Sequence, residues 1–319
     1  MLTIAVPTRD VAANLRGSEG VRTVVWDCSD GSEPPARERD AIDMVCVPHM
    51  SGGRGLYERI GALPNVRLIQ IPSAGFEHAL PFIPEGVALA NGRGLQDSRV
   101  AEFAVALAIM SRRLMPQFAD AQARGAWEPE YSRGQLADSR ALILGFGSIG
   151  AALAERLRAM EVHVEGVGRT ARTAPDGTVV HASEDLASVL PECDILFVVT
   201  PLNDETHGLV GRRMLSRLPD GALVVNVGRG PVVDTEALMA ECASGRLHAA
   251  LDVIDGEPLP EGHPAFSTPH MIITPHVAGF TPLTDSRYTD LIREQALTLQ
   301  AGGRGINIVA VGPHELSTA

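Results

Sequence analysis

The sequence predicts an α/β protein of two domains, each built on a parallel, doubly wound sheet. Three observations carry this prediction. Residues 141–169 follow a strand, turn, helix, strand pattern with three glycines at the turn. Before residue 91, short β-rich runs alternate regularly with helical or loop segments. The chain has 319 residues, 45% of them hydrophobic, which suits two domains and fills two cores.

The first domain is predicted from β-rich runs that recur at intervals of roughly twenty residues. We expect them to form a small parallel sheet with helices on both faces. Residues 49–55, HMSGGRG, follow the third run, at the strand edge where open α/β sheets bind ligands. After the fourth run, Ala74 and Gly75 either expose backbone N–H groups as an anion nest or form a plain turn. The five runs are Leu2–Val6, Val21–Trp26, Met44–Val47, Val66–Ile71 and Val87–Ala90.

A helix is predicted next, from a cap at Asp97 or Ser98 to about Leu114. Apolar residues alternate three and four apart along it, and this seam packs either within one subunit or against a second copy of the chain. Residues 117–139 are polar and are expected to be irregular. The seam consists of Val100, Phe103, Leu107, Met110 and Leu114.

The second domain begins with the glycine turn. Ala141–Leu144 is an apolar run typical of a buried parallel strand, and Gly145, Gly147 and Gly150 follow at G-x-G-x-x-G spacing. The first glycine allows the tight turn, the second lets the backbone approach a pyrophosphate, and the third lets the helix lie close to the strand. The helix N-terminus then offers N–H groups to the phosphates. This pattern predicts a Rossmann unit that binds a dinucleotide, with an ordinary βα turn as the alternative.

Further short strands extend this domain, with Asp234 as a helix N-cap and Gly245 as a C-cap. We expect a sheet of six or seven strands over residues 99–285. A final helix, about Leu283 to Leu299, crosses back, and Ile306–Val309 finishes in the first domain, which is therefore residues 1–98 and 286–319. The expected strands are Val162–Val167, Ile195–Val199, Leu223–Val227, Ala249–Val253 and Met271–Thr274.

Composition excludes several functions. A net charge of −12 disfavours nucleic acid and anionic membranes as partners. The sequence has neither a signal peptide pattern nor an apolar run of about 18 residues, so a cytoplasmic location is expected. The 27 basic residues are all Arg, which excludes a Schiff-base or Walker-type lysine. The cysteines lack zinc-ligand spacing, so we expect no metal site; they are Cys28, Cys46, Cys193 and Cys242.

Three stretches carry candidate chemistry, each at the carboxyl end of a predicted strand. They are NVGRGPVVD (226–234), DVIDGEP (252–258) and TPHVAGF (274–280). Because this edge of a parallel sheet faces the ligand crevice, we expect Arg229, Glu257 and His276 to meet there. Arginine offers a forked cation to a carboxylate, and a histidine paired with a glutamate offers a positioned proton. Each residue taken alone has a structural alternative. Arg229 could form a surface ion pair, Glu257 could cap a loop, and His276 could be a hydrogen-bonded core residue.

These motifs resemble those of the D-isomer-specific 2-hydroxyacid dehydrogenases. The similarity covers nearly the whole chain: SAG at 73–75, VAE at 100–102, GFGSIG at 145–150, TPLNDET at 200–206, VGRGPVVD at 227–234, ALDV at 250–253, EP at 257–258 and TPH at 274–276. It implies a Rossmann domain and a flavodoxin-like substrate domain. It also implies hydride transfer between a nicotinamide and the carbon of a small 2-keto or D-2-hydroxy acid.

The resemblance assigns roles to individual residues. Arg229 would bind the carboxylate and carbonyl of the keto acid, His276 would be the acid/base, and Glu257 would orient His276 and keep it a proton donor near neutral pH. Backbone amides of Ala74 and Gly75 would hold the carboxylate. Substrate choice would depend on Met50, Ser51 and either Phe76 or Tyr288. The implied cofactor residues are Gly145, Gly147, Ser148, Ile149, Gly150, Thr200, Pro201, Val227, Gly228, His276, Ala278, Gly279 and Asp252, the last near the nicotinamide amide.

One departure concerns the cofactor. NAD-binding units usually carry an acidic residue about twenty residues past the glycines to bind the ribose 2′-OH. Here Gly168 takes that position, and Arg169, Thr170 and Arg172 follow. We therefore expect these residues to bind a 2′-phosphate, so that NADP(H) is favoured over NAD(H). The alternative is that Arg169 faces solvent and Glu165 has no part in the selection.

The sequence thus predicts a homodimeric oxidoreductase for a small 2-keto acid such as glyoxylate or hydroxypyruvate. An aromatic content of 4% disfavours a pocket for a large substrate. Two alternatives stay open. One is a non-enzymatic dinucleotide sensor that acts like a corepressor, and the other is a dehydrogenase of phosphite or formate on the same scaffold.

Overall fold

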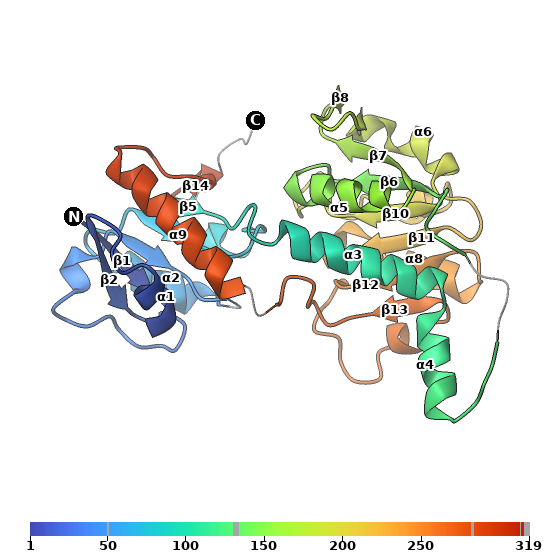
Figure 1. The fold of residues 1–319 in the computed structure, drawn as a ribbon, viewed down its shortest axis with the longest axis horizontal. Helices are drawn as coiled ribbons and strands as arrows, with labels where there is room; N and C mark the ends of the chain where they lie inside the picture. Colours follow the sequence, from blue (N-terminus) through green and yellow to red (C-terminus); the bar gives the residue numbers. More distant parts are fainter. Residues whose placement is uncertain (50, 130–133, 282–283, 313, 316–319) are drawn as a thin grey trace. The chain divides into compact units, whose positions relative to one another are not determined.

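The computed structural model describes residues 1–49, 51–129, 134–281, 284–312 and 314–315. The chain divides into two compact units, coloured along the sequence in Figure 1. Unit 1 is Met1–Gln96 with Thr281–Ala319, and unit 2 is Asp97–Phe280. The sequence predicts these boundaries at 98/99 and 285/286.

Unit 1 contains a seven-stranded sheet in the order β15-β14-β5-β4-β3-β1-β2. The five strands β2-β1-β3-β4-β5 are parallel and have the flavodoxin-like order. At the edge, β14 pairs antiparallel with β5. All five predicted β-rich runs form strands, several of them shorter than expected. The strands are β1 Leu2–Val6, β2 Val21–Val25, β3 Met44–Cys46, β4 Leu68–Gln70, β5 Ala88–Ala90, β14 Ile308–Val311 and β15 His314–Glu315.

Two cores flank the sheet of unit 1. Alternation along β1 sends Ile4 to one core and Ala5 to the other. The long helix α9 lies on the Ile4 side and buries Tyr288, Ile292 and Ala296, which are four residues apart. The helices are α1 Arg9–Asn14, α2 Arg54–Gly61 and α9 Thr284–Gln300, with 3₁₀ turns η1 Arg39–Ala41 and η2 Leu80–Phe82.

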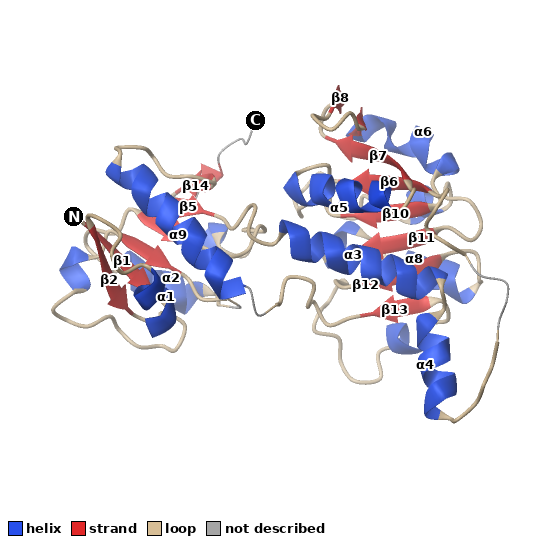
Figure 2. Ribbon diagram, viewed as in Figure 1, coloured by secondary structure: helices blue, strands red, loops and turns tan. Residues whose placement is uncertain are grey.

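Unit 2 contains an eight-stranded sheet in the order β13-β12-β11-β10-β6-β7-β9-β8 (Figure 2). From β9 to β12 this is the Rossmann order 3-2-1-4-5-6, with the switch point between β6 and β10. All pairs are parallel except β8 with β9. The predicted fold class is confirmed. The strands are β6 Arg140–Leu144, β7 His163–Gly168, β8 Arg172–Thr173, β9 Val179–Ala182, β10 Ile195–Val198, β11 Leu223–Asn226, β12 His248–Leu251 and β13 Met271–Ile273.

Helices cover both faces of this sheet. One core receives Leu107 of α3 and Leu153 of α5, and the other receives Leu186, Leu215 and Leu238 of α6, α7 and α8. The helices are α3 Asp97–Arg112, α4 Met115–Ala123, α5 Ser148–Ala159, α6 Leu186–Val189, α7 Arg212–Leu215 and α8 Thr235–Ala243, with 3₁₀ turns η3 Ser183–Asp185, η4 Leu190–Glu192, η5 Gly230–Val232 and η6 Pro264–Ser267.

Two segments differ from expectation. Residues 117–139 were expected to be irregular, but α4 extends to Ala123. Leu114 adopts a left-handed conformation (φ 50°) that ends the preceding helix, and Pro116 suits the first turn of the new one. The sheet also has eight strands rather than six or seven because β8 and β9 form a hairpin around Pro175, Asp176 and Gly177.

Candidate active site

Glu257 and His276 meet at the carboxyl edge of the unit 2 sheet. Glu257 lies in the loop after β12 and His276 in the loop after β13, and the distance from Oε1 to Nδ1 is 2.8 Å. The backbone N–H of Ile254 also donates to Glu257 Oε2 at 3.3 Å. The His276 side chain is 48% exposed. Because Nδ1 faces the carboxylate, Nε2 is the ring nitrogen that remains to exchange a proton with a bound molecule.

The charge on Glu257 is stabilised by its neighbours. Burial raises the pKa of this carboxyl, but the hydrogen bond and charge of His276, the N–H of Ile254 and the charge of Arg229 lower it. The net result is a pKa below the ordinary 4.5. Glu257 is therefore ionised near neutral pH, and Arg229 is close enough to act on it electrostatically.

Arg229 lies in the loop after β11, in a turn held by Asn226. The Asn226 side chain is 1% exposed; its Oδ1 accepts the N–H of Gly228 at 3.0 Å, and its Nδ2 donates to the Arg229 carbonyl at 3.0 Å. The Arg229 guanidinium donates to the Gly228 carbonyl at 2.7 Å. Asn226 is not among the site residues predicted from the sequence, although an asparagine that ends a buried strand before a glycine turn is a recognisable signal.

Asp252 holds the loop that carries His276. Its side chain is 1% exposed and accepts hydrogen bonds from the N–H groups of Val277 and Ala278, both at 2.9 Å, and from Thr274 Oγ1 at 2.6 Å. His276 itself adopts a left-handed backbone conformation with φ 54°. The sequence resemblance places Asp252 near a nicotinamide amide, and these contacts to the loop of His276 are additional to that role.

The glycine turn after β6 has the geometry that a pyrophosphate requires. Gly145 has φ 101°, and a Cβ there would lie 2.6 Å from the backbone N of Thr200. A Cβ on Gly150 would lie 2.6 Å from the Gly145 carbonyl oxygen, whereas one on Gly147 would meet nothing within 4 Å. Gly147 precedes α5 and makes no side-chain cap. Phosphate oxygens can therefore approach this backbone and the first N–H groups of α5, so the residues fit a dinucleotide.

The other predicted cofactor residues lie at the same edge of the sheet. Arg99 of α3 donates to the Gly279 carbonyl at 3.2 Å and so holds the end of that loop. Thr200 and Pro201 follow β10, Val227 and Gly228 follow β11, Ala278 and Gly279 follow β13, and Ser148, Ile149 and Gly150 begin α5.

At the end of β7, Arg172 folds back over Gly168. Its Nη2 donates to the Phe146 carbonyl of the glycine turn at 2.7 Å. A Cβ on Gly168 would lie 2.8 Å from Arg172 Nη1, so a side chain at this position would require the end of the guanidinium to shift. Arg169 and Thr170 are exposed. Glu165 lies earlier in β7, where its Oε2 is 2.8 Å from His181 Nε2.

In unit 1, the predicted substrate loops follow β3 and β4. Ala74 and Gly75 accept hydrogen bonds at their carbonyls, from Asn91 Nδ2 at 2.6 Å and from Ser73 Oγ at 2.7 Å. Ser51 Oγ donates to the His49 carbonyl at 3.3 Å, and Met50 lies outside the described residues.

The two aromatic candidates of unit 1 differ in exposure. Phe76 is half-buried against the core of unit 1. Tyr288 is 1% exposed, and its hydroxyl lies 2.9 Å from the backbone oxygens of Val47 and of Gln70. Tyr288 therefore supports the loop after β3 from within the core.

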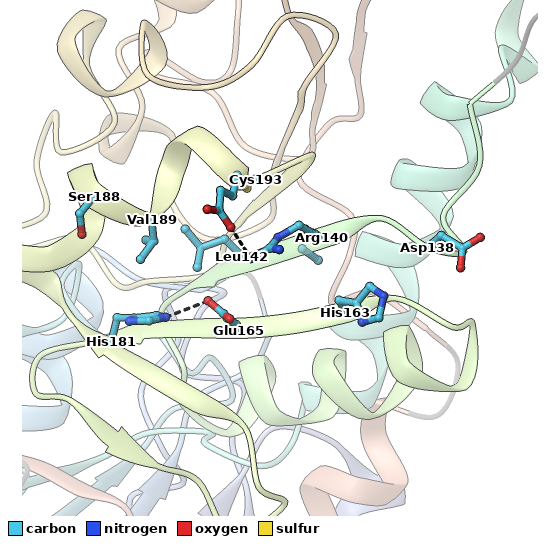
Figure 3. Close-up of a pocket in the computed structure, with 11 residues that line it drawn as sticks. Asp138, Arg140, Leu142, His163, Glu165, His181, Ser188, Val189 and Cys193 are labelled. Atoms are coloured by element: carbon cyan, nitrogen blue, oxygen red, sulfur yellow. Dashed lines mark hydrogen bonds and ion pairs between the residues drawn. The ribbon is translucent and has the colours of Figure 1, made fainter.

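A cavity of about 700 Å³ lies elsewhere in unit 2, against the first residues of β6 and β7 (Figure 3). The residues that line it include Arg140 and Glu192, which form an ion pair at 2.6 Å. Glu165 and His181 also line it, and their side chains point toward one another in Figure 3. The glycine turn and His276 follow the opposite ends of their strands, so this cavity is separate from the candidate chemistry.

Three further observations bear on the sequence predictions. In the described part of the chain, no helix combines the length and apolar character needed to cross a membrane. Among the same residues, no three side chains of His, Cys, Asp or Glu are grouped to hold a metal ion. The four cysteines are buried thiols.

Comparison with known proteins gives consistent matches. The family described as "D-isomer specific 2-hydroxyacid dehydrogenase, NAD binding domain" matches residues 105–278, more than half of the chain. A glyoxylate reductase from Thermofilum pendens is 32% identical over 287 residues, covering 84% of this chain and 83% of the relative.

Solved structures match over nearly the whole chain. A D-isomer-specific 2-hydroxyacid dehydrogenase from Xanthobacter autotrophicus Py2, solved with NADPH and MES, has a TM-score of 0.80 at 29% identity, covering 97% of this chain and 98% of that one. An NADPH-dependent glyoxylate/hydroxypyruvate reductase from Sinorhizobium meliloti, solved with NADP and malonate, has a TM-score of 0.75 at 26% identity, covering 100% of this chain and 99% of that one.

Proposed function

Because the chain belongs to the D-isomer-specific 2-hydroxyacid dehydrogenase family, we propose that it reduces a small 2-keto acid, with NADPH as the preferred hydride donor. Members of this family are NAD(P)-dependent 2-hydroxyacid dehydrogenases, which act on a CH–OH group. Glyoxylate and hydroxypyruvate are the substrates we propose first. The relatives named for these acids and the low aromatic content of 4% support a small substrate.

The observation that carries this proposal is the contact between Glu257 and His276 at 2.8 Å, with the charge of Arg229 acting on the same carboxylate. Bound NADPH supplies the hydride. His276 donates a proton from Nε2 to the oxygen of the substrate carbonyl and takes it back when the alcohol is oxidised. Glu257 fixes the orientation of the ring through its contact with Nδ1.

Arg229 binds the substrate in this proposal. Its guanidinium is a permanent cation with parallel N–H donors, which match a carboxylate or a carboxylate with its neighbouring carbonyl. Asn226 supports this role by fixing the backbone of the Arg229 turn. Within unit 1, we propose that backbone N–H groups of Ala74 and Gly75 hold a carboxylate and that Ser51 contributes to substrate choice.

The cofactor preference is proposed from Gly168 and Arg172. The cofactor site has a glycine in place of an acidic residue, and a guanidinium placed over it supports binding of a 2′-phosphate. Arg169 and Thr170, exposed just beyond the strand, are proposed to add to that site.

A homodimer in the cytoplasm is also proposed. The helix α3 packs within its own unit through Val100 and Leu107, so the predicted seam serves the core there. In contrast, Trp127, just after α4, is 93% exposed and Met115 is 48% exposed. We propose that these exposed apolar side chains contact a second copy of the chain. Light scattering of the purified protein measures the mass, and a monomer would contradict this part.

The activity is tested by following NADPH absorbance with glyoxylate and hydroxypyruvate, and the reverse reaction with the D and L forms of glycerate. We expect turnover with at least one keto acid and oxidation of the D form only. Tight NADPH binding without turnover of any keto acid would favour the sensor alternative. Turnover with phosphite or formate alone would favour the other dehydrogenases.

A further inference from the structure

We propose that Asp252 is a positioning residue that holds the backbone of the His276 loop so that the imidazole faces Glu257. This inference rests on the proposed acid/base role of His276. It gives Asp252 a function through other residues, whereas the sequence resemblance assigned it only a place near the nicotinamide amide.

The contacts of Asp252 converge on one short segment. Oδ1 accepts the N–H of Val277 at 2.9 Å and the hydroxyl of Thr274 at 2.6 Å, and Oδ2 accepts the N–H of Ala278 at 2.9 Å. The Asp252 backbone carbonyl also accepts the N–H of His276 at 2.9 Å. Asp252 thus binds residues that precede His276 in the sequence and residues that follow it.

The conformation of this segment requires such support. His276 has φ 54°, in the left-handed region that residues other than glycine rarely adopt. A conformation of this kind persists only where surrounding contacts impose it, and such residues cluster at functional sites. The bonds to Val277 and Ala278 begin at the residue directly after His276, so they fix its ψ and the direction of its Cα–Cβ bond.

The chemistry of a buried carboxylate suits this task better than that of an amide. Three donors point at Asp252, and a carboxylate has acceptor sites only. An asparagine would place its own NH₂ group against a backbone N–H or against the Thr274 hydroxyl. Since Asp252 is 1% exposed, water cannot readily replace the lost acceptor.

Asp252 also connects the two proposed catalytic loops. Its backbone N–H donates to the Asn226 carbonyl at 2.9 Å, and Asn226 holds the turn that carries Arg229. The adjacent strands β11 and β12 therefore each end in a buried polar side chain. Asn226 fixes the loop of Arg229, and Asp252 fixes the loop of His276. Displacement of the His276 loop by about 1 Å is enough to cost about 10²-fold in rate.

The test compares Asp252→Asn with the same substitution of an aspartate at the opposite edge of the sheet, where the strands begin. Asp194 Oδ2 accepts the N–H of Arg140 at 2.8 Å, before β10, so Asp194→Asn makes the same chemical change far from His276. For each variant, kcat, KM, the NADPH Kd from protein fluorescence, and Tm are measured. We expect Asp252→Asn to lower kcat by about 10- to 100-fold with the NADPH Kd within about twofold. Asp194→Asn should lower Tm without changing kcat.

A second pair of variants applies if Asp252→Asn does not fold. Thr274→Val removes the hydroxyl while keeping the shape, and Thr274→Ser restores it. We expect a lower kcat in the Val variant and rescue in the Ser variant. In NMR spectra, the His276 ring signals, assigned by their loss in His276→Ala, should shift or broaden in Thr274→Val only.

The outcomes separate this inference from the proposed function. An unchanged kcat and unchanged ring signals in Asp252→Asn and Thr274→Val would overturn it, even if His276→Ala is inactive. A rise in NADPH Kd that accounts for the whole loss would assign Asp252 to cofactor binding instead. If His276→Ala turns over normally, the acid/base assignment fails first, and the ring signals alone then decide whether Asp252 positions the loop.

Discussion

Glu257 Oε1 lies 2.8 Å from His276 Nδ1, although the two residues follow different strands, β12 and β13. The contact forms because parallel strands deliver their carboxyl ends to one edge of the sheet. It leaves Nε2 of the imidazole as the atom that exchanges a proton, and it places a charged partner on the other side of the ring.

Replacing Arg229 by lysine tests carboxylate binding. Lysine keeps the charge but loses the forked donors, so kcat/KM for the keto acid should fall by about 10- to 100-fold, mainly through KM. The NADPH Kd should not change. Arg213→Lys, an exposed position on α7, is the matched control and should behave as the unmodified protein. Equal kinetics for Arg229→Lys and the control would remove Arg229 from the substrate site.

Cofactor preference should depend on Arg172 and on the space above Gly168. Arg172→Ala removes a charged donor, so the ratio of kcat/KM for NADPH to that for NADH should fall by about 10- to 100-fold. Gly168→Asp should lower it further because the carboxylate repels a 2′-phosphate and displaces the guanidinium. Steady-state kinetics with both cofactors measure the ratio. If Arg172→Ala leaves this ratio unchanged, then either Arg169 binds the 2′-phosphate or the protein does not prefer NADPH.

Gly168→Ala separates the two effects of the aspartate. Its methyl group carries no charge but would lie 2.8 Å from Arg172 Nη1. If the placement of Arg172 selects the cofactor, this variant should also lose preference for NADPH, while kcat/KM with NADH stays near its original value. If charge alone matters, Gly168→Ala should keep the full preference.

Stability should depend on Glu257 only above a defined pH. Burial raises the pKa of this group, but the His276 contact and the other neighbours bring it below the ordinary 4.5. Because the folded chain holds this proton less tightly than the unfolded chain, the stabilisation is complete above pH 4.5 and is lost as the pH falls through the lowered pKa. The Tm difference between the native chain and Glu257→Gln should be present above pH 4.5 and should shrink as the pH falls below it. A difference that grows on acidification would contradict this sign.

Much of the fold was predictable because buried parallel strands are short apolar runs. The runs that include Ile4, Phe197 and Val225 are strands as expected. The hairpin of β8 and β9 was missed because Arg172 and Thr173 are exposed and carry no apolar pattern, although the Pro-Asp-Gly turn was visible. The helix α4 was missed because it buries only Ala121 and so lacks a clear apolar face.

The main residues of the candidate site could be predicted from the sequence, but the hydrogen bonds that hold them in place could not. Arg229, Glu257 and His276 could be proposed because strand ends converge at one edge of a parallel sheet. The contacts of Asn226 and Asp252 could not, because they depend on which backbone N–H groups face each side chain. Asp252 reaches Val277 and Ala278 across 25 and 26 residues of sequence. No local pattern encodes such a pairing.

The most direct test of the whole account is the turnover number of His276→Ala in the NADPH-dependent reduction of glyoxylate or hydroxypyruvate, measured together with the NADPH Kd. Loss of the proton donor should lower kcat by about 10² to 10⁴-fold, and NADPH should bind as tightly as before. Near-normal turnover by this variant would contradict the proposed chemistry.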